Sequence, residues 1–240
     1  MHLRLRSVVA AALALAFFPG CALAAAPPDD LQSVLDRLNV TSAKFHSASA
    51  EVEYDSIVTA PIEDTDKQTG NFYFERKNNA ASVGVHFKTH NGKDSGKAYT
   101  YVGGTFKLFE PVANVVTTHS GAGKYESYVV LGFGASGKDL QDKWNIKYLG
   151  SEMIPDDKEG KHLVKTAQLE LVAIDPAVRK TFSKVTIWVD TDRAVSIKQV
   201  FVLSPTSTWI CKYSNFQINQ SIPGDAFTFK TDRKTTYQNQ

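Results

Sequence analysis

A glycine-rich stretch near the middle of the chain comes closest to a known chemical motif. Gly132-Phe-Gly-Ala-Ser-Gly137-Lys138-Asp139 follows the phosphate-binding pattern G-x-x-x-x-G-K-[ST] up to its last position. In that pattern backbone N–H groups surround phosphates, the lysine adds positive charge and the final hydroxyl binds Mg²⁺. Asp139 replaces this hydroxyl and would repel phosphate, and no alternation of strands and helices surrounds the motif. We therefore expect a plain loop and no cofactor.

Histidine and aspartate side chains form no more specific catalytic pattern. His86 and His90 are four residues apart, but no third ligand follows at the spacing of a metal site, and H-E-x-x-H is absent. The nucleophile pattern G-x-S-x-G is absent as well. Two carboxylate pairs are interpreted as turn residues, because aspartate there bonds its own backbone: Asp64/Asp66 and Asp190/Asp192. We expect no catalysis and no metal, and a hydrolase that uses one such pair is the least favoured alternative.

The first 24 residues have the three parts of a secretory signal peptide. Arg4 and Arg6 precede an apolar run, and small residues follow up to Ala24. Cys21 ends the segment Phe-Pro-Gly-Cys, which is similar to a lipobox, and acylation there would anchor the protein to a membrane. We expect residues 1–24 to be removed and residues 25–240 to form one periplasmic domain. A membrane-anchored lipoprotein, held through Cys21, is the alternative.

The charge and cysteine content of the exported part argue against a nucleic-acid-binding protein and against a domain held together by disulfides. Removal of residues 1–24 takes away two of the 27 basic residues, which leaves as many basic as acidic residues, 25 of each. A nucleic-acid-binding domain would have a basic excess. Cys211 is then the one remaining cysteine, so the domain has no internal disulfide. Cys211 lies in an apolar strand pattern and is interpreted as a buried, inert thiol.

Periodicity predicts one helix followed by a long series of strands. Four leucine and valine residues recur at helical spacing after Asp30, so a helix should end near residues 39–43: Leu31, Val34, Leu35 and Leu38. From Phe45 the period changes to two, and turns such as Asn91-Gly92 separate the strands. The remaining segments are expected as follows: turns over 59–69 and 155–162, short helical pieces over 125–133 and 140–144, and a frayed tail over 230–240.

The predicted fold class is mainly β. We expect a strongly curved antiparallel sheet, an incomplete β-barrel, covered by the N-terminal helix and a central helical lid. An ordinary core is the better interpretation for most of its many aromatic residues. The alternative is an apolar cavity on the concave face, and composition alone does not separate the two. Such a cavity would suit an acyl chain, because burial contributes about 0.8 kcal/mol per methylene. The candidate lining residues are Phe72, Phe74, Val85, Phe87, Phe106 and Leu108.

The order of several short segments resembles the LolA/LolB-like family of outer-membrane lipoprotein carriers. Gly70-Asn-Phe-Tyr-Phe-Glu-Arg76 is similar to the family's glycine-led strand that ends in Arg-Pro. Gly104-Thr-Phe-Lys-Leu-Phe-Glu-Pro111-Val-Ala-Asn114-Val is similar to its "G-x-x-x-W-x-Y-x-P-x-x-x-Q-V" strand and turn. Ile222-Pro-Gly-Asp-Ala-Phe227-Thr-Phe229 is similar to its closing segment, "P-x-x-x-F-x-F". The resemblance covers residues 31–229, with Lys77 where the family has proline.

The resemblance implies a monomeric periplasmic carrier that binds lipoprotein or lipid acyl chains and passes them toward the outer membrane. It also implies an inner-membrane releasing complex and an outer-membrane acceptor as partners. Arg76 matches the family's lid-gating arginine and would donate hydrogen bonds to backbone carbonyls of the lid. Phe106 and Phe109 stand where Trp and Tyr are usual, which leaves the cargo open. The alternative is a lipid-sensing adaptor domain of the same fold that binds a membrane partner.

Overall fold

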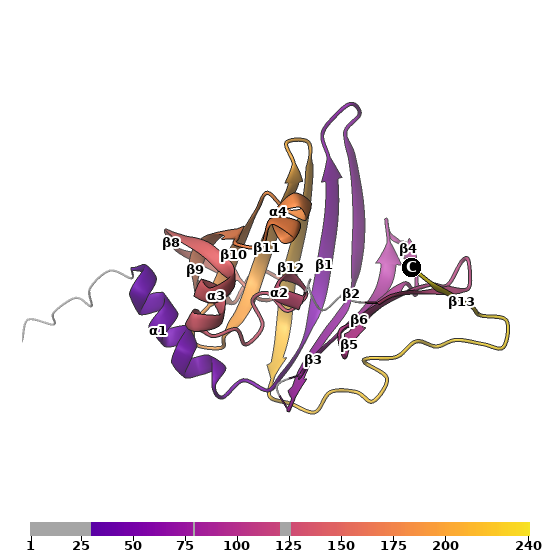
Figure 1. The fold of residues 1–240 in the computed structure, drawn as a ribbon, viewed down its shortest axis with the longest axis horizontal. Helices are drawn as coiled ribbons and strands as arrows, with labels where there is room; N and C mark the ends of the chain where they lie inside the picture. The colour runs from indigo at the N-terminus through magenta and orange to yellow at the C-terminus, as the bar shows by residue number, and fades with distance from the viewer. Residues whose placement is uncertain (1–29, 79, 121–125) are drawn as a thin grey trace, which may run out of the picture.

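A computed structural model describes residues 30–78, 80–120 and 126–240 of the chain. The expected signal peptide and Cys21 lie outside these residues. The helices and strands follow one another in this order (Figure 1): α1 (Leu31–Ser42), β1 (Ser47–Val58), β2 (Asp64–Lys77), β3 (Ala80–His90), β4 (Lys93–Asp94), β5 (Ala98–Val102), β6 (Thr105–Glu110), β7 (Val115–His119), α2 (Glu126–Val129), α3 (Gly137–Lys143), β8 (Trp144–Pro155), β9 (Leu163–Ala173), α4 (Pro176–Thr181), β10 (Lys184–Asp190), β11 (Val195–Ser204), β12 (Ser207–Ile218) and β13 (Thr236–Asn239).

All thirteen strands belong to one curved sheet that does not close into a barrel. Their order is β13-β7-β6-β5-β3-β2-β1-β12-β11-β10-β9-β8, with β4 beside β3. Neighbouring strands are antiparallel except β13, which runs parallel to β7. Figure 1 shows the sheet bending between β12, on the side of the helices, and β6, near the C-terminal segment. The expected curved antiparallel sheet is therefore confirmed.

The N-terminal helix forms where its apolar spacing predicts it. Asp30 caps α1, and its carboxylate accepts a hydrogen bond of 2.8 Å from the backbone N–H of Ser33. The residues of α1 that turn toward the sheet are all buried: Val34, Leu35 and Leu38. They pack with α3 and with β9 and β10 in one apolar cluster. This helix covers the β8–β11 part of the sheet, as Figure 1 shows.

The glycine-rich stretch around Gly137 forms the start of α3. Ser136 is the N-cap of α3, and its side chain accepts a hydrogen bond from the backbone N–H of Asp139. The Asp139 carboxylate in turn accepts hydrogen bonds from the Ser136 backbone and hydroxyl, at 3.1 Å and 2.7 Å. A Cβ at Gly137 would lie 2.3 Å from the Leu35 carbonyl oxygen, so glycine allows α1 and α3 to touch. These residues thus cap α3 and allow it to pack against α1.

One expected turn, one helix and the C-terminal tail differ from the prediction. β2 begins at Asp64 and pairs with β1 to the end, so the turn expected over 59–69 is limited to 59–63. α4 was not expected; Asp175 caps it and Pro176 begins it. The tail expected to fray contains β13, because Asn114 holds it through hydrogen bonds to Asp232 (3.0 Å) and Thr235 (2.8 Å).

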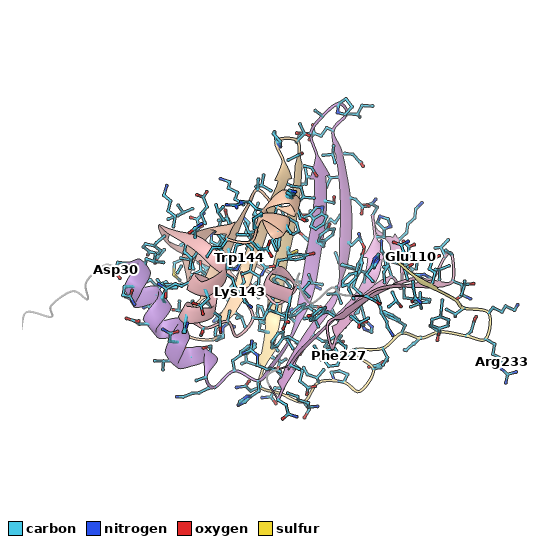
Figure 2. The ribbon with its side chains drawn as sticks, in the orientation of Figure 1. Asp30, Glu110, Lys143, Trp144, Phe227 and Arg233 are labelled. Carbon is cyan, nitrogen blue, oxygen red and sulfur yellow. The ribbon has the colours of Figure 1, made fainter. Side chains whose placement is uncertain are left out.

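The segment before β13 crosses the sheet at β3. A Cβ at Gly84 would lie 1.9 Å from the carbonyl oxygen of Ala226, which is fully buried. His86 Nε2 is 3.0 Å from the same carbonyl oxygen. Phe227 lies beside this part of the sheet in Figure 2. The resembling "P-x-x-x-F-x-F" segment thus serves here as a strap over β3 that needs glycine beneath it.

None of the helices in the described part of the chain is long and apolar enough to cross a membrane.

Candidate functional site

A cavity of about 660 Å³ occupies the concave face of the sheet. Small-molecule sites in proteins commonly have volumes of roughly 300–1,000 Å³. Side chains from β1, β2, β3, β5, β6 and β12 form the walls of this apolar cavity, and α2 covers it. The lining residues are Val52, Tyr54, Phe72, Val83, Val85, Phe87, Tyr99, Thr100, Tyr101, Phe106, His119, Ser120, Tyr128, Val129, Trp209, Cys211, Tyr213 and Gln240.

Several large side chains on this face are only half-buried, although they lie inside the molecule. Tyr99, Phe106 and Trp209 belong to this group, because one side of each ring faces the apolar cavity. Their other contacts are ring to ring: the Tyr99 and Phe106 centroids are 5.7 Å apart, and those of Tyr54 and Trp209 are 6.0 Å apart. The rings therefore hold one another in place and leave an apolar surface without a protein partner.

Four of the six residues expected to line a cavity do so: Phe72, Val85, Phe87 and Phe106. Phe74 and Leu108 are not among the lining residues. The Phe74 ring is fully buried, with Phe45 at 5.5 Å and Phe133 at 6.2 Å between centroids. The loop after α2 brings Phe133 over this end of β2, which strand alternation could not predict. Phe74 is thus a core residue under the loop, whereas Phe72 both stacks on Phe133 and faces the cavity.

The sequence reasoning missed the lining residues on β1, β5 and β12. Tyr99 and Tyr101 alternate on β5, and Trp209, Cys211 and Tyr213 alternate on β12. Each alternation was visible in the sequence. Their assignment to one cavity depends on pairing across the sheet, since β12 lies next to β1 in space and far from it along the chain. Non-local pairing of this kind leaves no local signal.

Burial in the apolar cavity wall changes the acidity of several side chains. Burial raises the pKa of the Cys211 thiol to about 12. Burial also raises the pKa of Tyr54 and of Tyr213 above the ordinary value. A thiol that stays protonated is a poor nucleophile. The interpretation of Cys211 as an inert side chain agrees with this direction, although part of its surface faces the cavity rather than protein atoms.

The loop after α2 is fastened to the sheet by polar side chains. Arg76 Nη1 donates a hydrogen bond of 2.9 Å to the Gly134 carbonyl, and its guanidinium carbon lies 5.5 Å from the Phe74 ring centroid. Gln199 Nε2 donates one of 2.6 Å to the Leu131 carbonyl. Both bonds end on backbone carbonyls, the type of partner expected for Arg76. They fasten the loop that follows α2 to the sheet at two points.

The other candidates for chemistry have structural partners. His90 contacts the Asp66 carboxylate, and His86 contacts the Ala226 carbonyl. Asp190 accepts hydrogen bonds from the Asp192 backbone at 2.9 Å and from Arg193 Nε at 2.6 Å. In residues 30–78, 80–120 and 126–240, no group of three or more His, Cys, Asp and Glu could hold a metal ion. His90 and Asp190 thus stabilise a hairpin and a turn, and His86 contacts the segment that crosses β3.

The chain matches no family model and no curated protein. Its fold is similar to that of an uncharacterized conserved protein from Thermus thermophilus, with a TM-score of 0.51, 11% identity, and coverage of 87% of this chain and 98% of that one. It is also similar to MucB, with a TM-score of 0.50 and 9% identity. That match covers 84% of this chain, which spans 63% of MucB. Identities this low show a shared fold alone.

The family resembled by the sequence occurs among the matched structures too. A LolA superfamily protein from Nitrosomonas europaea matches with a TM-score of 0.38 and 17% identity, over 82% of this chain and 97% of that one. A solved structure described as a LolA superfamily protein is therefore among the matches. A TM-score this low supports no conclusion about activity.

Proposed function

We propose that this protein is a periplasmic carrier that binds acyl chains of lipoproteins, or another lipid, in its apolar cavity and delivers them toward the outer membrane. The observation that carries the proposal is the group of half-buried aromatic side chains around a cavity of about 660 Å³. Each methylene that enters such a surface contributes about 0.8 kcal/mol. The protein acts by binding and release and carries out no catalysis.

The remaining parts of the proposal come from the N-terminal sequence and the family resemblance. Export through the signal peptide at residues 1–24 puts the cavity in the periplasm, with acylation at Cys21 as the variant that tethers it. A monomer then receives its cargo from an inner-membrane releasing complex and passes it to an outer-membrane acceptor. Arg76 gates this exchange, because its bond to the Gly134 carbonyl holds the cover of the cavity.

Cargo bound in the cell is the direct test. The protein is purified from its own periplasm, measured by native mass spectrometry and extracted for lipids. We expect co-purified lipid or acylated protein, and uptake of a fluorescent fatty acid once the cargo is removed. A protein that is purified without bound lipid and takes up no fatty acid would contradict the proposal.

Neighbouring residues of β6 provide a matched pair of variants. Phe106 faces the apolar cavity, and Lys107 is exposed on the other face of the strand. Phe106→Glu places a charge in the cavity and should lower fatty-acid affinity at least about tenfold, whereas Lys107→Glu should leave it unchanged. Val85→Phe fills the cavity without a charge and should weaken binding of long chains more than of short ones. Equal affinity in all three variants would contradict the proposed site; circular dichroism checks their folding.

The gating role of Arg76 is tested by kinetics. Arg76→Leu removes the bond to Gly134 and should speed both uptake and release of the fatty acid in stopped-flow measurements, with a smaller change in the equilibrium constant. Lys77→Leu, one residue further along β2 and exposed, is the control. If Arg76→Leu changes neither rate, Arg76 does not gate the cavity.

A further inference from the structure

A second, smaller cavity adjoins the apolar cavity and differs from it in chemistry. This charged chamber has a volume of about 330 Å³ and lies between α3, the loop after α2 and the ends of β2 and β3. Four ionisable side chains line it: Arg76, Glu126, Asp139 and Lys143. Asp139 and Lys143 are exposed, so the chamber opens to solvent. Figure 2 shows Lys143 and Trp144 beside α3 at this place.

The two cavities follow one another along the same face of the sheet. Ala81 lines the charged chamber and Val83 lines the apolar cavity, and the two residues alternate onto one face of β3. Two residues of a strand span about 7 Å. On β2, Phe72 and Arg76 also share one face but are four residues apart, with the buried Phe74 between them. On β3, the linings of the two cavities are therefore one strand repeat apart, within the length of a single lipid.

Polarity changes in one direction along this face. At the far end of the apolar cavity, Tyr54 contacts Phe87 and Trp209, with ring centroids 6.2 Å and 6.0 Å away. At the junction, the Tyr101 hydroxyl lines the apolar cavity and interacts with the Glu126 carboxylate of the charged chamber. Burial and the nearby Glu126 raise the pKa of Tyr101 to about 12, so this hydroxyl keeps its proton. The site as a whole matches an amphiphile.

The charged chamber holds two cations and two carboxylates, and both cations act electrostatically on Asp139. Arg76 uses one of its five N–H donors for the Gly134 carbonyl. Among the described residues, neither Arg76 nor Lys143 forms a salt bridge with a carboxylate. Asp139 is engaged by Ser136 in the cap of α3. Glu126 is then the carboxylate best placed to accept an ammonium group.

We propose that the charged chamber binds a zwitterionic phosphate–ammonium headgroup, with the acyl chain of the same lipid in the apolar cavity. Arg76 and Lys143 contact the phosphate, since guanidinium and ammonium groups form charge-assisted hydrogen bonds with phosphate oxygens. Glu126 contacts the ammonium group. This inference rests on the proposed function, because it requires an acyl chain in the apolar cavity, and it names a phospholipid as the cargo class.

Three ligands that carry the same acyl chain distinguish the contribution of the headgroup to affinity from that of the chain. Lysophosphatidylethanolamine, lysophosphatidylglycerol and monoacylglycerol are used below their micellar concentrations to displace a fluorescent fatty acid. The wild-type protein should bind lysophosphatidylethanolamine about tenfold more tightly than monoacylglycerol, the size expected of one charge-assisted hydrogen bond. Equal affinities for these two would overturn the inference while leaving the carrier function intact.

Variants of the charged residues then test which part of the headgroup each residue contacts. Glu126→Gln should weaken lysophosphatidylethanolamine about tenfold and leave lysophosphatidylglycerol and monoacylglycerol unchanged. Lys143→Gln should weaken both phospholipids and leave monoacylglycerol unchanged. Lys138→Gln is the control, because Lys138 is also on α3 but pairs with Asp142 at 2.7 Å. If Glu126→Gln alters all three ligands equally, the headgroup is not in the chamber. If no ligand binds the wild-type protein, the carrier function itself fails.

Discussion

The two halves of the sheet have similar strand patterns but opposite interiors. In the β8–β11 half, Leu169, Leu171, Val185 and Ile187 are completely buried against α1 and α3. In the half formed by β1–β6 and β12, Tyr99, Phe106 and Trp209 are only half-buried around the apolar cavity. We refer to these parts as the packed half and the hollow half. They show that apolar strands alone do not determine whether a core or a binding cavity forms.

The size of the covering helix explains the contrast. α1 has twelve residues and presents a complete apolar stripe to the packed half. α2 has four residues and, with the loop around Phe133, covers the hollow half. A sheet must bury its apolar face against another layer, and a short helix leaves part of that face uncovered. The cavity is the space that remains.

The largest difference between the halves should appear when large side chains are shortened. Leu169→Ala leaves a void in the packed half and should lower the free energy of unfolding by about 2–5 kcal/mol. Phe106→Ala enlarges a cavity that already exists and should cost only about 1–2 kcal/mol, despite the larger side chain. Urea unfolding of both variants measures this. Equal losses would mean that the hollow half is as tightly packed as the other.

The second difference concerns ion pairs. Arg193 bonds two buried carboxylates at an end of the packed half, with 2.7 Å to Asp156 and 2.6 Å to Asp190. Arg193→Ala leaves both buried carboxylates without their cation and should lower the free energy of unfolding by about 3 kcal/mol. On the hollow half, Lys212 of β12 forms an ion pair with Glu53, and its side chain is 51% exposed. Lys212→Ala should therefore lower the free energy of unfolding by at most about 0.5 kcal/mol. Chemical denaturation measures the free energy of unfolding of both variants. A larger loss for Lys212→Ala than for Arg193→Ala would contradict this ranking of the two ion pairs.

Acid should affect the two halves unequally as well. Burial acts against ionisation of Asp156, but hydrogen bonds from His162 and Arg193 outweigh it and lower the pKa of its carboxyl. A pKa that folding lowers adds stability above the unfolded value, about 4, and this stability disappears as pH falls through the folded value. Asp156→Asn should therefore flatten the stability–pH curve in acid. Asp66 has a lowered pKa of the same origin, with His90 as partner, but is more exposed, so Asp66→Asn should change the curve less. Melting temperatures between pH 3 and pH 7 measure both.

The smallest effect, and the one most specific to the hollow half, is the reactivity of Cys211. Because burial raises the pKa of the Cys211 thiol to about 12, very little of it is ionised at pH 8, and alkylation by iodoacetamide should be far slower than for a free cysteine. Because Cys211 lines the apolar cavity, bound fatty acid should slow the reaction further. Mass spectrometry of the labelled protein follows the rate. If bound fatty acid leaves the labelling rate unchanged, the ligand does not lie against β12.

Much of the secondary structure could be predicted from local pattern. The spacing from Leu31 to Leu38 predicted α1, and Asn91-Gly92 forms the expected hairpin, with φ values of 50° and 77°. The prediction of a frayed tail was wrong, because β13 pairs in parallel with β7. Asp232 and Thr235, just before β13, bond to the Asn114 side chain, which is more than a hundred residues away along the chain. α4 was missed because Asp175-Pro176 signals a helix start only weakly within a series of strands. Such long-range contacts override local preference.

The sequence by itself determined which side chains share a face, because alternation along a strand depends only on backbone geometry. It thereby placed Phe72, Val85, Phe87 and Phe106 among the candidates for a lining. Only the tertiary structure decided that Phe74 belongs to the core and that Tyr99 and Trp209 belong to the cavity. The physical reason is that burial depends on what covers a face, and the cover here is a short helix and a loop brought in from the middle of the chain. The charged chamber beside Arg76 likewise exists only where α3, that loop and β2 meet.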